Sequence, residues 1–387
     1  MSQTFEAAAA SLRDALADAG RGLVEREAMV ELVALSAVAG EHLLVIGPPG
    51  TAKSEAVRRT ARALGGSYFE YLLGRFTEPS EIFGPVDLRK LREGTVETET
   101  TGMLPEAEVA FLDEVFLGST AILNTLLGVL NERTFRRGHT RMKVPLRVCV
   151  GASNGLPEEE SLAAFADRFL ARIFVEPVPD PQLEELLAGG ASLWRETEAR
   201  VASLEALDVL ARGAQAADLG PVRPHLAHAL RTLRAAGIGL SDRRAVKVQR
   251  LMAAAAALAG RQTPGVADLW PLIYAVPTKE GQALAREVLR ELLAATENPA
   301  LAAAALEASA GPMARAQRIA RAGREVLSGR PSQGAAEELS AWRLKLEGVV
   351  REMDAGFAPE TLPPELQSLR GEIRIALEGP APAVAQA

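Results

Sequence analysis

Cysteine, aromatic residues and net positive charge are scarce in this sequence, and long apolar runs do not occur. Only Cys149 among the 387 residues is a cysteine, so no internal disulfide can form and a small disulfide-stapled secreted protein is excluded. The 43 basic and 50 acidic side chains leave a net charge of −7, which argues against a nucleic-acid partner bound through bulk charge. No run reaches the about 18 apolar residues of a membrane-spanning helix, and the N-terminus lacks a basic-then-apolar secretion signal. We therefore expect a cytoplasmic protein with no membrane span.

The composition that remains is typical of a folded protein rich in helix. Hydrophobic residues make up 48% and charged residues 24%, and at roughly 100–200 residues per domain the length suggests two or three domains. Aromatic residues reach only 4%, while alanine runs such as Ala253–Ala257 recur in the second half. Such runs favour helix over strand, although a GC-rich genome would also raise the alanine content without any structural reason.

Short apolar segments in the first half alternate with helical patterns. This alternation predicts a parallel β-sheet covered by helices on both faces, because a strand buried on both sides is apolar throughout. The predicted strands are Leu43–Ile46, Tyr68–Leu72, Val109–Leu112, Val148–Ala152 and Ile173–Val175.

The pattern changes after Pro177, Pro179 and Pro181, where only helical segments follow. We therefore predict an α/β core over residues 1–180, an all-helical domain over 181–280 and a helical C-terminal extension over 281–378. The Pro- and Ala-rich end, residues 379–387, is expected to be disordered.

A glycine-rich loop between the first predicted strand and the next helix has the sequence GPPGTAKS. In that context backbone N–H groups and the helix N-terminus can surround a phosphate group. Lys53 would reach the β- and γ-phosphates of a nucleotide, and the Ser54 hydroxyl would bind Mg²⁺. A Gly/Pro turn that merely precedes a lysine is the alternative. The loop residues are Gly47, Pro48, Pro49, Gly50, Thr51, Ala52, Lys53 and Ser54.

Ala52 departs from the usual pattern of such loops, which have a glycine before the lysine. The extra methyl group is tolerated without strain only at a negative φ, so we expect Ala52 to have one.

Two acidic residues, Asp113 and Glu114, follow the predicted strand Val109–Leu112. Parallel strands end at one edge of a sheet, so these carboxylates are expected near the phosphate loop. Asp113 would hold Mg²⁺ through water, and Glu114 would act as the general base for the attacking water or at least position that water. Alone, an Asp-Glu pair after a strand is usually a solvated strand end, but downstream of a phosphate loop it indicates ATP hydrolysis. It also argues against a small-molecule kinase, which activates no water.

Asn154 ends the next strand, where it can donate to the γ-phosphate or orient the same water. An asparagine after a strand is also a common turn residue, so its position alone leaves both interpretations open. Cys149 lies within the strand and is expected to be a core thiol.

Taken in order, these motifs resemble the AAA+ ATPases, more narrowly the MoxR family, and within it the RavA-type members. The resemblance covers about Leu23–Pro277 and implies a P-loop AAA+ core with a separate all-helical lid. Besides the phosphate loop, the matching segments are Phe76–Pro85, Leu112–Phe116, Leu126–Arg133, Phe165–Phe169 and Leu240–Arg244.

The resemblance implies further site residues. Asn154 matches the first sensor, and Arg168 matches the arginine finger that reaches the nucleotide of a neighbouring subunit, with Arg172 as the alternative finger. Arg243 matches the second sensor, with Arg244 as the second choice. The non-functional alternatives are a helix-end ion pair for Arg168 and a solvated helix start after Ser241 for the other two. Val24 and Glu25 lie where the family contacts adenine.

Two segments resemble features that face the centre of such rings. Residues of about 77–105 match an insert in the second core helix, and Thr134–Pro145 matches a hairpin with a basic tip, although a basic hairpin can also simply discourage strand pairing. The pore loop of protein-threading AAA+ unfoldases is not found, since Phe83-Gly84 matches it poorly. Limited remodelling of a partner is therefore favoured over processive unfolding.

The resemblance implies a Mg²⁺-dependent ATPase that forms a ring, expected to be a hexamer, and uses ATP to remodel or mature a partner with a von Willebrand factor A domain. A chelatase-type or gas-vesicle motor is disfavoured by the RavA-like loop. From other classes, a nucleotide-gated scaffold with little turnover and a DNA-stimulated motor stay open. The intact Lys53, Asp113 and Glu114 argue against the scaffold, and the acidic charge argues against the DNA motor.

Overall fold

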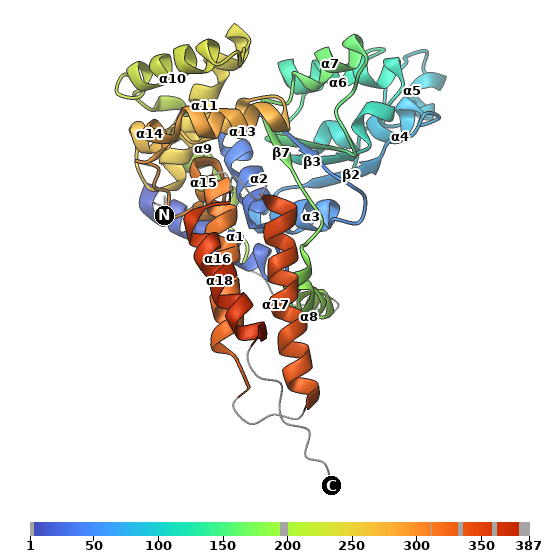
Figure 1. The fold of residues 1–387 in the computed structure, drawn as a ribbon. Helices are drawn as coiled ribbons and strands as arrows, with labels where there is room; N and C mark the ends of the chain where they lie inside the picture. The colour runs from blue at the N-terminus through green and yellow to red at the C-terminus, as the bar shows by residue number, and fades with distance from the viewer. Residues whose placement is uncertain (1–3, 194–199, 311, 332–335, 358–361, 379–387) are drawn as a thin grey trace.

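The structure, a computed structural model, describes residues 4–193, 200–310, 312–331, 336–357 and 362–378. The predicted tail 379–387 lies outside these ranges. The centre is a five-stranded parallel sheet with the strand order β2-β3-β6-β1-β7 (Figure 1). The strands are β1 (Leu43–Ile46), β2 (Tyr68–Leu72), β3 (Val109–Asp113), β6 (Val148–Ser153) and β7 (Ala171–Phe174). All five predicted strands are confirmed, and β7 begins two residues earlier than expected.

Alternate residues of the strands face two different hydrophobic clusters, one on each side of the sheet. Leu43 and Val45 of β1 pack with α1 (Phe5–Gly20), α2 (Glu27–Ala39) and α3 (Lys53–Leu64). Leu44 and Ile46 pack with α6 (Thr120–Glu132) and α7 (Glu160–Ala166). Burial on both faces explains why these strands are apolar throughout.

The segment between β2 and β3 holds two short helices, α4 (Pro79–Phe83) and α5 (Leu88–Arg92), and a 3₁₀ turn, η1 (Leu104–Glu106). An isolated antiparallel bridge pairs Val86 with Thr98. A second 3₁₀ turn, η2 (Val115–Leu117), follows β3. The predicted hairpin is confirmed: β4 (Thr134–Arg137) and β5 (Thr140–Lys143) form a separate antiparallel pair.

The chain after β7 is helical throughout its described residues. Its helices from α9 to α15 share the first hydrophobic cluster with α1, α2 and α3, so the all-helical part and the sheet are joined by one continuous core. These elements are η3 (Asp180–Gln182), α8 (Leu183–Leu193), α9 (Leu204–Ala216), α10 (Arg223–Ala235), α11 (Asp242–Leu258), η4 (Val266–Asp268), α12 (Pro271–Ala275), α13 (Lys279–Val288), α14 (Arg290–Leu293) and α15 (Ala302–Ala310).

The last three helices form a hydrophobic cluster of their own. They are α16 (Pro312–Ser328), α17 (Ala336–Gly356) and α18 (Pro364–Glu378), and they extend away from the sheet at the bottom of Figure 1. Trp342, Leu346 and Leu369 are among the buried residues that hold them together. Two ion pairs link α17 to the segment after β7: Lys345 Nζ lies 2.7 Å from Glu184, and Arg351 lies 3.9 Å from Asp180.

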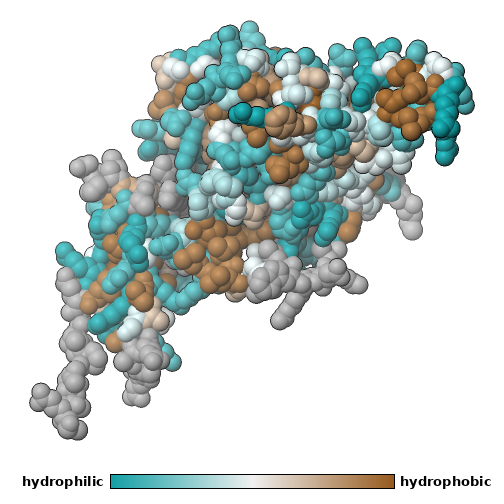
Figure 2. Space-filling model, turned by 90° about the vertical axis from the view of Figure 1, so that its right-hand side faces the viewer, coloured by the Kyte–Doolittle hydropathy of each residue, from teal (hydrophilic) through white to brown (hydrophobic). Residues whose placement is uncertain are grey.

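Among the described residues, none of the helices combines the length and the apolar character needed to cross a membrane. On the face shown in Figure 2, hydrophobic residues form separate patches surrounded by hydrophilic ones.

Candidate active site

The phosphate loop lies at the carboxyl edge of the sheet, between the end of β1 and the start of α3. Its first residue, Gly47, is fixed by its N–H, which donates to Ser153 O at 3.0 Å. A Cβ atom at Gly47 would lie 2.3 Å from the carbonyl oxygen of Val175, so only glycine fits there. Pro48, Pro49 and Gly50 are exposed. The tip of the loop is therefore open to a ligand.

Lys53 lies at the start of α3 with its ammonium group turned into the loop. Its Nζ donates to Gly47 O at 2.6 Å and to Pro48 O at 3.0 Å, and the residue is 7% exposed. Burial lowers the pKa of Lys53, and the negative charges of Asp113 and Glu114 partly oppose that shift. A phosphate group in the loop would restore the negative environment that favours the charged amine.

Ala52 does not have the negative φ expected from its sequence; that expectation is wrong. Its φ is +57° and its ψ is 26°, the left-handed conformation, because this residue turns the loop into the first turn of α3. An L-residue in this conformation costs roughly 1–2 kcal/mol. The site therefore carries the strain that a glycine here would avoid.

Three of the four described non-glycine residues with positive φ border the phosphate loop or the acidic pair. They are Glu25 at 59°, Ala52 at 57° and Glu114 at 49°, while the fourth, Arg133, ends α6. Backbone strain of this kind tends to gather at functional sites, where the surrounding structure enforces it. The positions of these strained residues therefore indicate the same site as the phosphate loop.

Asp113, Glu114 and Asn154 come together because β3 and β6 are neighbours in the sheet and both end at this edge. The Asn154 side-chain amide donates to Glu114 Oε1 at 2.6 Å. The backbone N–H of Glu114 donates to Asp113 Oδ1 at 3.0 Å. The amide therefore fixes the carboxylate of Glu114 at the edge where the phosphate loop lies.

The oxygen atoms of Ser54 and Asp113 are suited to a hard cation such as Mg²⁺. Ser54 lies at the N-terminus of α3 beside Lys53, and the charge of Asp113 acts on Lys53. Among the residues with described positions, no group of three or more His, Cys, Asp or Glu side chains could hold a metal by itself. Two protein oxygens fit an ion that takes its other ligands from phosphate and water.

Arg26 is a site residue that the sequence did not indicate. It is 4% exposed, and its guanidinium donates to Thr51 O at 2.7 Å, Glu176 O at 2.7 Å and Glu25 O at 2.6 Å. Burial lowers the pKa of Arg26. The side chain thus ties the phosphate loop to the segment after β7. No local pattern marks it, because its acceptors lie up to 150 residues away.

A cavity of about 300 Å³ opens beside Arg26. Glu25, one of the two residues expected near adenine, lines it, whereas Val24 is buried at 7% exposure. Its walls come from α2, β7, α13 and the C-terminal helices α16 and α17. The lining includes Met29, Val175, Gln282, Ile319 and Phe357.

Arg168 lies apart from the phosphate loop, in the turn between α7 and β7. Because Leu43 of β1 is opposite Ala171 of β7, this turn is at the amino edge of the sheet, whereas the phosphate loop is at the carboxyl edge. Its side chain lines a second cavity, of about 630 Å³, whose lining includes Phe116 and Leu127 but neither the phosphate loop nor Asp113 and Glu114. The backbone of Arg168 therefore lies at the opposite end of the strands from the phosphate loop.

Arg172, the alternative finger, is excluded by burial. It is 6% exposed within β7 and donates to Pro277 O at 2.9 Å and to Ala166 O at 3.1 Å. Burial, assisted by the nearby charge of Arg244, lowers the pKa of Arg172 to about 10.

The two arginines at the start of α11 also lie on the amino side of the sheet. Arg243 donates to Asn131 Oδ1 at 2.7 Å, at the end of α6. Arg244 is 2% exposed and donates to the backbone of Phe169, Leu170 and Ala275 and to the Asp167 carboxylate. Arg244 is therefore a structural residue, and its choice as an alternative second sensor is wrong, because its N–H groups are taken by its own chain.

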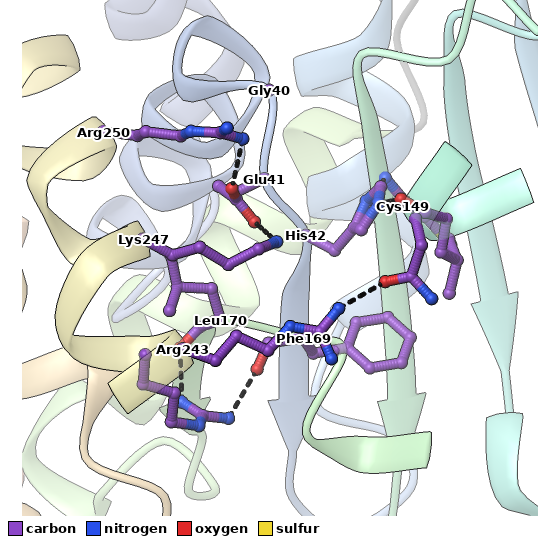
Figure 3. A network of polar contacts seen from close by, with 12 residues as sticks. Gly40, Glu41, His42, Cys149, Phe169, Leu170, Arg243, Lys247 and Arg250 are labelled. Carbon is purple, nitrogen blue, oxygen red and sulfur yellow. Dashed lines mark hydrogen bonds and ion pairs between the residues drawn. The ribbon is translucent and has the colours of Figure 1, made fainter. Parts of the chain in front are cut away.

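Figure 3 shows Arg243, Lys247 and Arg250 on α11, with Lys247 and Arg250 extending toward Glu41. Glu41 is 1% exposed and lies 2.6 Å from Lys247 Nζ and 2.9 Å from Arg250 Nη1. The α11 helix is thus anchored to the junction between α2 and β1.

Comparison with known proteins supports the fold and shows a similarity to MoxR domains. The domain described as the MoxR domain of MoxR–vWA–β-propeller ternary systems matches residues 10–212. An uncharacterized protein of Methanocaldococcus jannaschii is 36% identical over 248 residues, 64% of this chain and 66% of that protein. The chaperone MoxR1 of Mycobacterium tuberculosis is 28% identical over 187 residues, 47% of this chain and 49% of that protein.

A crystal structure of a candidate ATPase from Cytophaga hutchinsonii matches this fold with a TM-score of 0.60. It covers 76% of this chain and 96% of that one at 16% identity, so the likeness concerns the fold alone. The chain spans just under two thirds of the length of the M. jannaschii relative.

Proposed function

This chain belongs to the family of MoxR domains found in MoxR–vWA–β-propeller ternary systems, and from that premise we propose that it is a Mg²⁺-dependent AAA+ ATPase that acts on a partner protein in a ring. The single observation that carries the proposal is the meeting of Lys53, Asp113, Glu114 and Asn154 at the carboxyl edge of the sheet.

Each residue has a chemical task in this proposal. The loop N–H groups and Lys53 bind the β- and γ-phosphates, and Glu114 accepts a proton from the attacking water. Asn154 holds the Glu114 carboxylate in place through the 2.6 Å hydrogen bond. Ser54 and Asp113 would hold Mg²⁺, which offsets the charge that develops on the transferred phosphoryl group. Arg26 holds the phosphate loop in a fixed position relative to the cavity beside Glu25. We assign this cavity to the adenine base of ATP.

The separation of Arg168 from its own phosphate loop supports a shared active site. A cation that cannot reach its own nucleotide can serve the nucleotide of a neighbour in a head-to-tail ring, and such a trans arginine is worth about 10³–10⁵ in rate in other NTPases. We propose a homo-oligomeric ring on this basis, with six subunits because the resemblance to AAA+ ATPases implies that number. Arg243 would act as second sensor only toward a neighbouring subunit, because it lies at the amino side of the sheet.

The proposed partner is a protein with a von Willebrand factor A domain, as in the systems for which the matching family is described. The proposed activity is chaperone-like remodelling or maturation of that partner in the cytoplasm. The GPPGTAKS loop supports the finer placement near RavA-type members. The division into a core over 1–180, a lid over 181–280 and an extension over 281–378 belongs to the same proposal.

Phosphate release by the purified protein with ATP and Mg²⁺ tests this function, with nucleotide binding measured in parallel. The wild-type chain should hydrolyse ATP, Lys53→Ala should lose binding and hydrolysis, and Glu114→Gln should bind ATP without hydrolysing it. Turnover near the wild-type rate in Glu114→Gln would contradict the assignment of Glu114 as the general base. ATP binding by a wild-type protein that shows no turnover, with or without a von Willebrand factor A domain protein, would favour a nucleotide-gated scaffold instead.

A further inference from the structure

The turn that carries Arg168 is held by two buried arginines from other parts of the chain. The turn covers residues 166–170, between α7 and β7. Arg172 donates to the carbonyl of Ala166 at 3.1 Å. Arg244 donates to the Asp167 carboxylate at 2.6 Å and to the carbonyls of Phe169 and Leu170, each at 2.8 Å. Every residue of the turn except Arg168 therefore supplies an acceptor to one of these two arginines.

The same two arginines bind the segment that follows α12. Arg244 donates to Ala275 O at 2.8 Å, and Arg172 donates to Pro277 O at 2.9 Å. Their exposures of 2% and 6% mean that water cannot replace these bonds. A guanidinium has five N–H donors in a rigid planar fork, so the four bonds of Arg244 and the two of Arg172 fix the turn in position and in orientation.

Arg168 is the one residue of the turn that supplies no acceptor to Arg172 or Arg244. Its Nε, like the Nε of Arg172, is buried and has no hydrogen-bond partner within the described part of the chain. The backbone around it is fixed, while this donor of its guanidinium stays unsatisfied. Such an arrangement suits a side chain whose partner is supplied from outside the subunit.

From this geometry we propose that Arg244 is a positioning residue for Arg168: it clamps the turn 166–170 from the start of α11 and acts on hydrolysis only through that turn. The proposal rests on the proposed function, since it needs Arg168 to serve a neighbouring active site. It gives Arg244 a role different from contact with a nucleotide.

The clamp also connects the turn to elements that line the nucleotide cavity. Gln282 of α13 lines the 300 Å³ cavity, and its side-chain amide donates to Arg172 O at 3.0 Å. At the other end, Glu41 anchors α11 through Lys247 and Arg250. A shift of α11 or α13 relative to the sheet would therefore move the Arg168 turn.

The test compares Asp167→Ala and Arg244→Lys with wild type in steady-state ATP hydrolysis and in binding of a fluorescent ATP analogue. Asp167 is 37% exposed at its side chain, so its removal should leave the fold intact while it frees one side of the clamp. We expect kcat to fall by about tenfold or more with an unchanged Kd, because small displacements of a catalytic group are costly. Asp242→Ala, which removes a 98% exposed carboxylate from the same helix, is the matched control and should behave as wild type.

The decisive comparison is a double-mutant cycle with Arg168→Ala. If Arg244 acts through Arg168, then Arg168→Ala with Arg244→Lys, and Arg168→Ala with Asp167→Ala, should be no slower than Arg168→Ala alone. A further multiplicative loss in the double variants would overturn the proposal, since it would mean a separate contact with the nucleotide. Wild-type kcat in Asp167→Ala, while Arg168→Ala is slow, would also overturn it.

Absence of hydrolysis in the wild type would instead contradict the proposed function. If Arg244→Lys fails to fold, the Asp167→Ala cycle decides alone.

Discussion

At the scale of single residues, the site is built from conformations and burial that cost free energy. Ala52 and Glu114 are both left-handed, and Lys53 and Arg26 are cations taken largely out of water. Each is held there by the elements around it: the start of α3, the end of β3, and carbonyl groups of the loop. The strain is therefore concentrated where the phosphate groups would bind.

Ala52→Gly should stabilise the protein against unfolding by about 0.5–1 kcal/mol. Glycine removes the cost of the left-handed conformation but gains entropy in the unfolded chain, and the first effect is the larger one. Urea unfolding measures the difference. Ala56→Gly is the matched control, since the same change in the buried, right-handed interior of α3 should destabilise by about 1 kcal/mol or more. A loss of stability in Ala52→Gly would contradict the strain assigned to this residue.

Glu31 of α2 should make stability depend on pH. Its carboxylate accepts hydrogen bonds from the N–H groups of Ala303 and Ala304 at the start of α15, at 3.2 and 2.7 Å. Burial raises the pKa of Glu31 from 4.5 to about 7, more than these bonds lower it. The folded state thus keeps a proton that the unfolded state loses, so this group's contribution to stability falls as pH rises from 4.5 through 7.

In Glu31→Gln the decrease in stability caused by the titration of Glu31 should be absent. Between about pH 5 and about pH 8, the free energy of unfolding should therefore decrease by about 2 kcal/mol less in this variant than in wild type. Urea unfolding at the two pH values provides the comparison, with Glu347→Gln, a change at an exposed carboxylate of α17, as the control. An identical pH dependence in wild type and Glu31→Gln would show that Glu31 does not titrate in this window.

The positions of the loop and of the acidic pair could be predicted from the sequence, but the bonds of the buried arginines could not. Gly47 to Ser54, Asp113 and Glu114 are marked by short local patterns next to predicted strands. Arg26 and Arg244 bind acceptors up to 150 residues away, and a buried arginine looks like a surface arginine in the sequence. The left-handed Ala52 was missed because its conformation follows from the loop as a whole.

At the scale of elements, the strands were predictable because a strand buried on both faces is a continuous apolar run. The segment between β2 and β3 was predicted only as an insert, because its short helices α4 and α5 have no periodicity long enough to read. The packing of α9 and α11 on α1 and α2 was not predicted either. Alanine-rich helices have small side chains on every face, so composition does not say which neighbour they meet.

The C-terminal helices α16 and α17 form part of the wall of the cavity beside Arg26. Phe357, at the end of α17, is 9% exposed and lines that cavity together with Ile319 of α16. If the adenine base binds in this cavity, Phe357→Ala should raise the Kd for ATP by about fivefold, which corresponds to about 1 kcal/mol of lost binding free energy. Titration of a fluorescent ATP analogue measures this. Leu344→Ala, a change on the same helix at a residue that is 60% exposed, should leave the Kd unchanged; an unchanged Kd in Phe357→Ala would place the base elsewhere.

At the scale of the whole molecule, we propose that each active site is completed by two subunits. Lys53, Glu114 and Asn154 lie at the carboxyl edge of the sheet, and the turn of Arg168 lies at the amino edge. In the proposed ring, the Arg168 side of one copy would meet the loop side of the next. Such a head-to-tail contact closes into a ring when the rotation between copies allows it.

The most direct test of this shared active site is phosphate release by mixed subunits. Alone, Arg168→Ala should retain only a small residual rate because it lacks the finger, and Glu114→Gln should show no turnover because it lacks the general base. Mixed in equal amounts, about one contact in four pairs an intact Glu114 with an intact Arg168, so activity should return to as much as about a quarter of the wild-type rate. A mixture as inactive as its two components would contradict the account.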